Sequence, residues 1–370
     1  MFLALREIRH QPSKFALAVA VVALVAYLTF FLDGLANGLA SSYRTGIEQR
    51  DAAAVVITED SNEQINASFL SRDQVEAGTG ALAAQGVDEL ALVAGTARPV
   101  SGAASGETRS DLYVFGLDLG GFARPQVVEG RDVVDAADEV VVDDSLKRDG
   151  WGLGTVFQLV GSEHRWTVVG FTHDDTYTTA PMVFADRQAV LANTPNTLVP
   201  AVNALLVHHA ASDEQTVPER TRQSLDDAGL QALSTQEFIN TLSGYSAQVA
   251  TFSLMVAALI VIAALVLAIF LYVLNLQKKP VFGIMKARGV PTNYLVRSGV
   301  VQAAVLSATG VLAGFALTAA TSLVLPEQIP FRVMPGQYAA ILAAFVLCSV
   351  IGGLISVRFV SRIDPAEAIA

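Results

Sequence analysis

The stretch VATFSLMVAALIVIAALVLAIFLYVLNL, residues 249–276, contains no charged side chain. A bilayer core about 30 Å thick is crossed by roughly 20 apolar residues in a helix, so this stretch is long enough to span a membrane. Lys278 and Lys279 follow directly, and basic residues favour the cytosolic side. We therefore expect a membrane-spanning helix whose C-terminal end faces the cytosol.

Three more stretches have the length and hydropathy of a span, and we assign them to residues 15–35, 298–325 and 338–358. The first of them resembles a signal peptide, but its apolar run is longer than the core of such a peptide, and we interpret it as a retained anchor. Basic residues gather before the first span, in the loop 277–297 and after residue 358, whereas the connector 326–337 holds only Arg332. The positive-inside rule therefore places both chain ends in the cytosol of a bacterial inner membrane.

The composition agrees with a chain that is partly embedded in lipid. Hydrophobic residues make up 52% of the chain and charged residues only 16%, with a mean hydropathy of +0.46. The net charge of -11, with the acidic residues concentrated between residues 48 and 237, argues against a nucleic-acid partner, which requires a basic face. A single cysteine, Cys348, excludes an intrachain disulfide framework.

Residues 36–248 have the texture of a mixed α/β (α+β) extracytoplasmic domain inserted between the first two spans. Apolar alternation or β-branched runs predict strands at 53–58, 90–94, 112–117, 139–142, 156–160 and 166–171. Helices are predicted at 72–84, 145–150 and 214–228. At the two ends of the domain, residues 35–49 should continue the first span, and residues 235–248 should feed straight into the second as a stalk helix.

The domain offers no catalytic constellation in its sequence. His208 and His209 are adjacent and would point to opposite faces of a strand, and His164 and His173 flank a predicted strand as surface residues. The acidic pairs 143–144 and 174–175 are typical of loops and helix caps. No P-loop pattern occurs. We therefore expect no enzyme activity, no metal site and no intrinsic cofactor, with ATP hydrolysed by another polypeptide.

Two spans carry small residues four positions apart, a spacing that lets helix backbones approach closely. Gly34 and Gly38 lie at the outer end of the first span, and Gly310 and Gly314 lie in the third. Either a dimer seam or packing within one chain accounts for the first pair.

Seven short segments, in order along the chain, resemble the MacB/FtsX-type permeases of ABC exporters in their short, four-span form. These segments are 3–9 (LALREIR), 128–131 (VEGR), 138–143 (DEVVVD), 153–156 (LGTV), 166–170 (WTVVG), 282–290 (FGIMKARGV) and 363–369 (IDPAEAI). The resemblance extends over the whole chain. It identifies residues 1–14 as a cytoplasmic amphipathic elbow and residues 359–370 as a cytoplasmic tail.

This resemblance implies a function in ATP-driven transport. Within the loop 277–297, the family's coupling helix, which docks on the ATPase, corresponds to Ile284, Met285, Lys286, Ala287, Arg288 and Gly289. Arg288 stands where the family more often has a small or apolar residue. The resemblance also implies a homodimer of permeases with two separate ABC ATPase subunits. Nucleotide-driven closure would then move the stalks as rigid bodies.

The spans contain few polar residues, so a hydrophobic or amphipathic substrate fits better than one that needs an aqueous conduit. The layout is most similar to that of the HrtB-type haem exporters, which implies haem as the transported substrate. No histidine lies where the outer leaflet is expected, so oxygen or thioether ligands would be required. The candidates for ligating haem, packing on it or pairing with its propionates are Phe30, Phe31, Asp33, Tyr43, Arg44, Glu48, Arg50, Tyr245, Phe252 and Met255.

Two alternatives use the same architecture. The chain could export a lipid, a peptide or an antibiotic through a different groove. It could also resemble the FtsX-like signalling proteins, which transport nothing and use a partner's ATP hydrolysis to activate a cell-wall hydrolase. For phenylalanines such as Phe30 and Phe31, a place in the lipid or in the helix core is the simplest interpretation.

Overall fold

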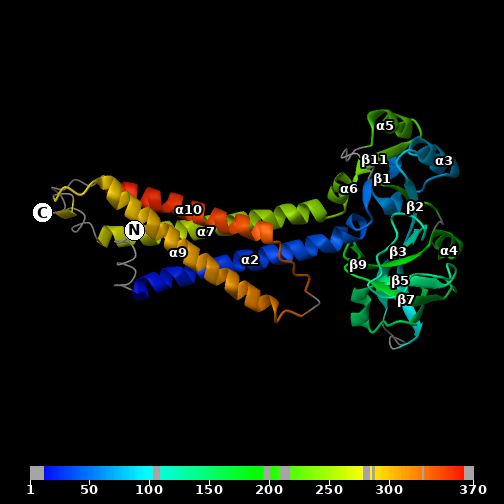
Figure 1. The fold of residues 1–370 in the computed structure, drawn as a ribbon, viewed down its shortest axis with the longest axis horizontal. Helices are drawn as coiled ribbons and strands as arrows, with labels where there is room; N and C mark the ends of the chain where they lie inside the picture. Colours follow the sequence, from blue (N-terminus) through cyan, green and yellow to red (C-terminus); the bar gives the residue numbers. More distant parts are fainter. Residues whose placement is uncertain are drawn as a thin grey trace. The chain divides into compact units, whose positions relative to one another are not determined.

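The computed structural model describes residues 12–102, 109–195, 201–208, 217–277, 284–285, 288–326 and 329–361 (Figure 1). The chain divides into two compact units, one made of residues 1–39 and 248–370 and the other of residues 40–247. We call the second unit the inserted domain. The expected elbow and tail lie almost entirely outside the described residues.

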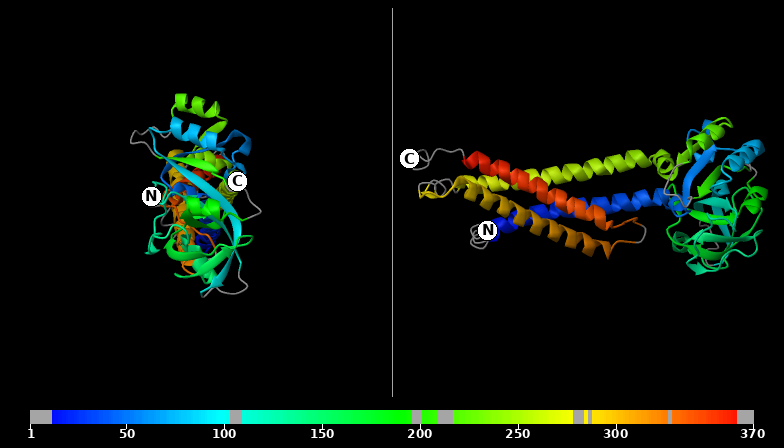
Figure 2. Two further views of the ribbon diagram at one scale, coloured as in Figure 1. Left: turned by 90° about the vertical axis from the view of Figure 1, so that its right-hand side faces the viewer. Right: turned by 45° about the horizontal axis from the view of Figure 1, so that its top comes forward.

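The first unit is built from four long helices, which run side by side in both Figures 1 and 2. Each contains a segment long and apolar enough to cross a membrane. The helices are α2 (Pro12–Glu48), α7 (Tyr245–Gln277), α9 (Thr292–Ser322) and α10 (Pro335–Ser361). The four predicted spans fall on these helices, and the prediction that residues 35–48 continue the first span is confirmed.

Small residues bring the helices together. A side chain at Gly310 would collide with Val22 of α2, and one at Gly314 would collide with Ala23 and Ala26. On the other side of α9, the Ser307 hydroxyl donates to the Phe345 carbonyl of α10 at 3.4 Å. The glycine pair of the third span therefore packs α9 against α2 within one chain.

Gly34 and Gly38 also pack within the chain, which decides between the two interpretations of this pair. An added Cβ at Gly34 would lie 2.4 Å from the Phe331 ring, and one at Gly38 would lie 2.0 Å from the Pro330 carbonyl oxygen. The Arg332 amide donates to the Gly34 carbonyl at 2.9 Å. The connector between α9 and α10 thus lies directly on α2, and these glycines are covered by it.

The inserted domain contains an 11-stranded sheet with mostly antiparallel pairing. Its strands are β1 (Ala52–Thr58), β2 (Val87–Ser101), β3 (Ser110–Leu117), β4 (Glu129–Gly130), β5 (Glu139–Asp143), β6 (Val156–Leu159), β7 (Trp166–Thr172), β8 (Thr176–Tyr177), β9 (Ala180–Asp186), β10 (Ala204–His208) and β11 (Leu230–Ser234). Its helices are α3 (Arg72–Ala81), α4 (Arg187–Ala192), α5 (Glu219–Asp226) and α6 (Thr235–Thr241), with 3₁₀ turns at Glu59–Ser61, Ile65–Ala67 and Asp144–Asp149. All six predicted strands are confirmed.

The long strand β2 joins two halves of this sheet. Residues 87–90 pair with β10, and residues 91–101 pair with β3 and β6. From β2 the pairing runs through β3, β9, β5, β7 and β6 and returns to β2. This closed ring of six strands surrounds a core that includes Trp151, Phe157 and Trp166, and closure removes exposed strand edges. In the other half, α3 and α5 cover the β11–β1–β10 end of the sheet (Figure 1).

Two expectations for this domain need correction. The strands β4, β8, β9, β10 and β11 were not predicted. For β10 the reason is that the run ALLVH at 204–208 is buried on both faces and lacks the alternation of a half-exposed strand. The stalk helix predicted at 235–248 is not continuous. Leu242 is extended, with a φ of -54° and a ψ of 129°, and Gly244 has a φ of 83°, so the helix breaks between α6 and α7.

Candidate functional site

The last turns of α2, residues 40–48, belong to the inserted domain and are fastened to the segment that contains β8. The amides of Thr178 and Thr179 donate to the carbonyls of Tyr43 and Ser42, at 3.2 and 2.9 Å. Gly46 leaves no room for a side chain, because a Cβ there would lie 1.9 Å from the Met182 sulfur. Backbone bonds and close packing together fix the orientation of this helix end in the domain.

A buried ion pair reinforces the same attachment just beyond the helix. Arg50 Nη2 lies 2.6 Å from Asp175 Oδ1, and both side chains are only 1% exposed. The Arg50 guanidinium also lies 4.6 Å from the centre of the Phe184 ring. Burial lowers the pKa of Arg50 and raises the pKa of Asp175, while their mutual attraction opposes both shifts. The expectation that Asp175 is a simple loop residue is therefore incomplete, since it is a buried partner of the helix end.

Asp143 extends the network beneath Asp175. Its carboxylate accepts hydrogen bonds from the Asp175 amide at 2.6 Å and from the Ser145 amide at 3.0 Å. Asp143 caps the 3₁₀ turn as predicted, but its side chain is fully buried. Burial raises the pKa of Asp143 to about 6, against the lowering effect of the hydrogen bonds. A sequence signal was present, because Asp143 directly continues the buried run 140–142.

The second connection of the inserted domain is different. α6 begins with a capping box, in which Ser234 and Glu237 satisfy each other's backbone amides, and ends at Thr241. The next helix, α7, begins at Tyr245, so the three residues Leu242, Ser243 and Gly244 form a break between the helices. The chain enters the inserted domain through the unbroken helix α2. It leaves the domain through two separate helices, α6 and α7, with the break at residues 242–244 between them.

The histidines of the described region each pair with a different acidic residue. His164 lies 3.4 Å from Asp138, His173 lies 2.7 Å from Asp144, and His208 lies 3.3 Å from Asp51. The Asp144 hydrogen bond raises the pKa of His173. In the described part of the chain, no group of three or more His, Cys, Asp or Glu residues could hold a metal ion. His209, the neighbour of His208, lies outside the described residues.

The haem candidates in the helical unit occupy different surroundings. Phe30 is 1% exposed and packs against Tyr338 and Phe315, so it belongs to the bundle core and is not available to a ligand at the surface. Phe31 is half-buried and stacks on Tyr27. Asp33 accepts a hydrogen bond from Asn37 at 3.0 Å.

On α7, the structure describes two more of these candidates. Phe252 is half-buried, and Met255 is 47% exposed. Nothing in the described contacts joins Met255 to Asp33, so the structure does not gather these candidates into one ligand set.

The candidates in the inserted domain lie closer together. The rings of Tyr43 and Tyr245 are 6.2 Å apart, and Arg44 pairs with Glu48 at 2.6 Å on one face of α2. Arg50 is the exception. We expected its guanidinium to pair with a haem propionate. The guanidinium is instead buried and paired with Asp175, which argues against a direct role of Arg50 in ligand binding.

The coupling segment is described only in part. Ile284 and Met285 are helical, and Arg288 and Gly289 lie in a turn in which the Arg288 amide donates to the Ile284 carbonyl at 3.1 Å. Ile284 and Arg288 are exposed. Lys286 and Ala287 lie outside the described residues. The described part of the predicted segment therefore offers an apolar and a basic side chain one helical turn apart.

Comparison with known proteins finds one matching family and several relatives of similar length. The family described as FtsX-like permease C-terminal matches residues 253–365. A protein of Staphylococcus haemolyticus named as the hemin transport system permease HrtB is 23% identical over 372 residues, covering 100% of this chain and 99% of that protein. A protein of the same name from Staphylococcus epidermidis is 24% identical over 370 residues, with the same coverage. An uncharacterized ABC transporter permease of Mycobacterium bovis is 27% identical over 381 residues, covering 100% of this chain and 99% of that protein.

Two solved structures match part of the chain. The periplasmic region of MacB from Actinobacillus actinomycetemcomitans has a TM-score of 0.38 and 13% identity, covering 54% of this chain and 98% of that structure. The extracellular domain of the transporter YknZ from Gram-positive bacteria has a TM-score of 0.35 and 14% identity, covering 49% of this chain and 98% of that structure.

Proposed function

This chain is an ABC transporter permease of the MacB/FtsX type, an integral membrane protein, and we propose that it expels a hydrophobic or amphipathic molecule, with haem favoured. The energy comes from a separate ABC ATPase, of which two copies serve a homodimer of this permease. The relatives that match over the full length are named as permeases, and those from Staphylococcus carry a name for hemin transport. That full-length similarity is the observation that carries the proposal.

The proposed orientation puts both chain ends and the loop 277–297 in the cytosol of a bacterium, with the inserted domain outside. The clustering of Lys278, Lys279 and Arg297 in this loop supports it. In this orientation, Ile284, Met285, Lys286, Ala287, Arg288 and Gly289 face the ATPase. The exposed Ile284 and Arg288 are suited to a docking helix that combines apolar contact with charge.

Mechanical transmission is favoured by the way α2 ends. The helix is continuous from Pro12 to Glu48, and its last turns are held by backbone bonds, by the Gly46–Met182 contact and by the Arg50–Asp175 pair. A shift or rotation of α2 would therefore be passed to the inserted domain. The break at 242–244 lets the connection through α7 bend while α2 acts as the lever.

Haem is the favoured cargo because the two named relatives point to it and because the accessible candidates suit it. Tyr43 and Glu48, at the end of α2 in the inserted domain, carry oxygen atoms that can ligate iron. The Tyr43 ring offers aromatic surface, and Arg44, which pairs with Glu48, offers a cation for a propionate. Phe30, Arg50 and Tyr245 are not part of the proposed set, because all three are buried by contacts within the chain.

The test is titration of the purified full-length permease, in lipid nanodiscs, with haemin. We expect a saturating Soret band whose position shifts in Tyr43→Phe or Glu48→Gln and stays unchanged in Tyr294→Phe, a control on α9. Cells that lack the gene should become sensitive to haemin, and the wild-type gene should restore growth. No saturable Soret band and unchanged haemin tolerance would point to the export of a lipid, peptide or antibiotic, or to FtsX-like signalling through a cell-wall hydrolase.

A further inference from the structure

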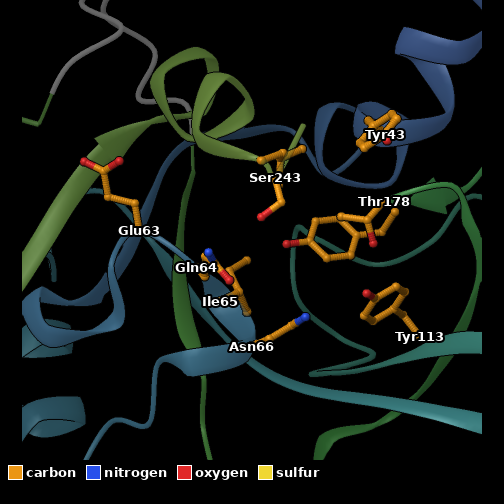
Figure 3. Close-up of a pocket in the computed structure, with 10 residues that line it drawn as sticks. Tyr43, Glu63, Gln64, Ile65, Asn66, Tyr113, Thr178 and Ser243 are labelled. Carbon is orange, nitrogen blue, oxygen red and sulfur yellow. The ribbon is translucent and has the colours of Figure 1, made fainter. Parts of the chain in front are cut away.

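An open pocket of about 350 Å³ lies in the inserted domain, where five separate segments meet (Figure 3). The end of α2 contributes Tyr43, the turn after β1 contributes Asn66, and the break between α6 and α7 contributes Ser243. Tyr113 comes from β3 and Thr178 follows β8. The volume is at the lower end of the range for small-molecule sites, which suits a molecule of monosaccharide size.

Several polar side chains of the pocket have no hydrogen-bond partner within the described chain. No described residue hydrogen-bonds to the side chain of Asn66, Tyr113 or Ser243, and the Thr178 hydroxyl oxygen is buried without a partner. In Figure 3 the Ser243 hydroxyl points into the middle of the pocket, and the Asn66 amide points towards Tyr113. Several hydroxyl and amide groups therefore converge on one space that a ligand can fill.

The charge of the lining excludes several ligand classes. Among the described residues that line the pocket, none is basic, so a phosphate or a carboxylate would find no cation. The one acidic residue, Glu63, directs its carboxylate away from Tyr113 (Figure 3), which leaves an organic cation without a counter-charge. A porphyrin with two propionates is disfavoured for the same reason as other anions.

We propose that this pocket binds a neutral, polyhydroxylated molecule, a sugar ring, through hydroxyl and amide hydrogen bonds and contact with tyrosine rings. Each sugar hydroxyl both donates and accepts, as do the phenol, serine and threonine hydroxyls that line the pocket. Tyr177, only 3% exposed, forms an edge-to-face pair with Tyr113 at 5.1 Å and gives the pocket a rigid aromatic wall. The sugar is a ligand of the inserted domain and is distinct from the exported molecule.

A ligand here would act on the break between α6 and α7. The pocket is lined both by Leu242 and Ser243 of the break and by Tyr43 of α2. A sugar that bonds to Ser243 and touches Tyr43 therefore ties the break to the end of α2. Binding should slow amide hydrogen exchange at residues 242–244.

The experiment uses the full-length permease in lipid nanodiscs, because detergents with maltose or glucose head groups would compete. Saturation-transfer NMR measures binding of glucose and N-acetylglucosamine, and of glucose 6-phosphate and glucosamine as an anion and a cation. We expect the two neutral sugars to bind and both charged analogues to bind at least tenfold more weakly. Tyr113→Phe and Asn66→Ala should each weaken binding by a factor of roughly 2 to 10, as expected for the loss of one hydrogen bond.

Tyr113→Phe keeps the ring contact with Tyr177 and should fold normally, which near-UV circular dichroism would verify. Tyr294→Phe, on α9, is the matched control and should leave binding unchanged. The proposal is wrong if neither neutral sugar binds, if a charged analogue binds as tightly, or if Tyr113→Phe and Asn66→Ala bind as well as the wild type. Haemin titration of the same samples is independent of these outcomes, so failure of haem binding and failure of sugar binding are separately visible.

Discussion

Arg50 and Asp175 are joined at 2.6 Å, and both side chains are 1% exposed, in the core of the inserted domain just beyond the end of α2. Two charges removed from water are expensive unless they pair closely. The pair links residue 50, which follows the first long helix, to a loop 125 residues further along the chain. It therefore fixes how the chain enters the domain, and it gives the most sensitive point at which that attachment can be tested.

Removing one partner of this pair should destabilise the inserted domain strongly. Asp175→Ala leaves the Arg50 cation buried and unpaired, and we expect a loss of roughly 3–5 kcal/mol in the free energy of unfolding. Trp151 and Trp166, the chain's two tryptophans, are both buried in this domain, so denaturant unfolding followed by tryptophan fluorescence reports on it. Glu129→Gln, which removes the exposed partner of Lys147, should change stability by about 0.5 kcal/mol or less. Equal effects of the two changes would contradict the role given to burial.

Asp143 should make stability depend on pH in a defined direction. Because the folded pKa is raised to about 6 by burial, the folded state binds its proton more tightly than the unfolded state, with a usual pKa of about 3.9. The protonated Asp143 side chain therefore stabilises the folded state. This contribution is complete below a pH of about 4 and is lost as the pH rises through about 6. The stability difference between the wild type and Asp143→Asn should therefore fall by roughly 2–3 kcal/mol between these limits. A difference that is constant or grows with pH would refute the assignment.

Gly38 should tolerate no side chain, because a Cβ there would lie 2.0 Å from the Pro330 carbonyl oxygen. Gly38→Ala forces the connector away from α2, and we expect a loss of roughly 1–3 kcal/mol. The sole cysteine, Cys348 on α10, allows the helical unit to be followed by the rate of maleimide labelling during thermal unfolding. Gly336→Ala is the control, since open space surrounds that glycine. If Cys348 in Gly38→Ala is labelled at the same rate as in the wild type, the connector does not pack on α2.

The break at 242–244 should matter for transport more than for stability. Replacing Ser243 and Gly244 by alanine favours one continuous helix, because alanine has the highest helix propensity and Gly244 has a φ of 83° that alanine disfavours. We expect export of the substrate to fall several-fold while ATP hydrolysis by the complex continues. Inserting two alanines after Ala136, in the exposed turn before β5, is a control that alters no stalk. If the variant with alanine at 243 and 244 exports the substrate as well as the wild type, the break between α6 and α7 has no role in transport.

Arg288 should contribute to docking of the ATPase. It is exposed in the turn after Ile284, and Arg288→Glu reverses its charge without disturbing a buried contact. We expect copurification of the ATPase subunit to fall by about tenfold or more if the charge faces the partner. Arg72→Glu, on α3 of the inserted domain, should leave copurification unchanged. Equal recovery of the ATPase with both variants would place the docking surface elsewhere.

The four membrane helices could be predicted because their signal is local. An uncharged run such as 249–276 needs no distant partner to be recognised, and the basic residues at 278–279 mark one end of it. The six predicted strands were found for the same reason. β10 was missed because its continuous apolar run, 204–208, does not distinguish a central strand from a short buried helix.

What only the tertiary structure decided concerns segments far apart in the chain. The sequence by itself determined that residues 34 and 38 are small and that residues 50 and 175 are charged. The fold decided that the connector at 330–331 packs on the two glycines, that Arg50 and Asp175 bury their charges together, and that five separate segments line the pocket beside Ser243. The physical reason is that close approach, desolvation and enclosure arise between partners, and which partners meet is set by the packing of the whole chain.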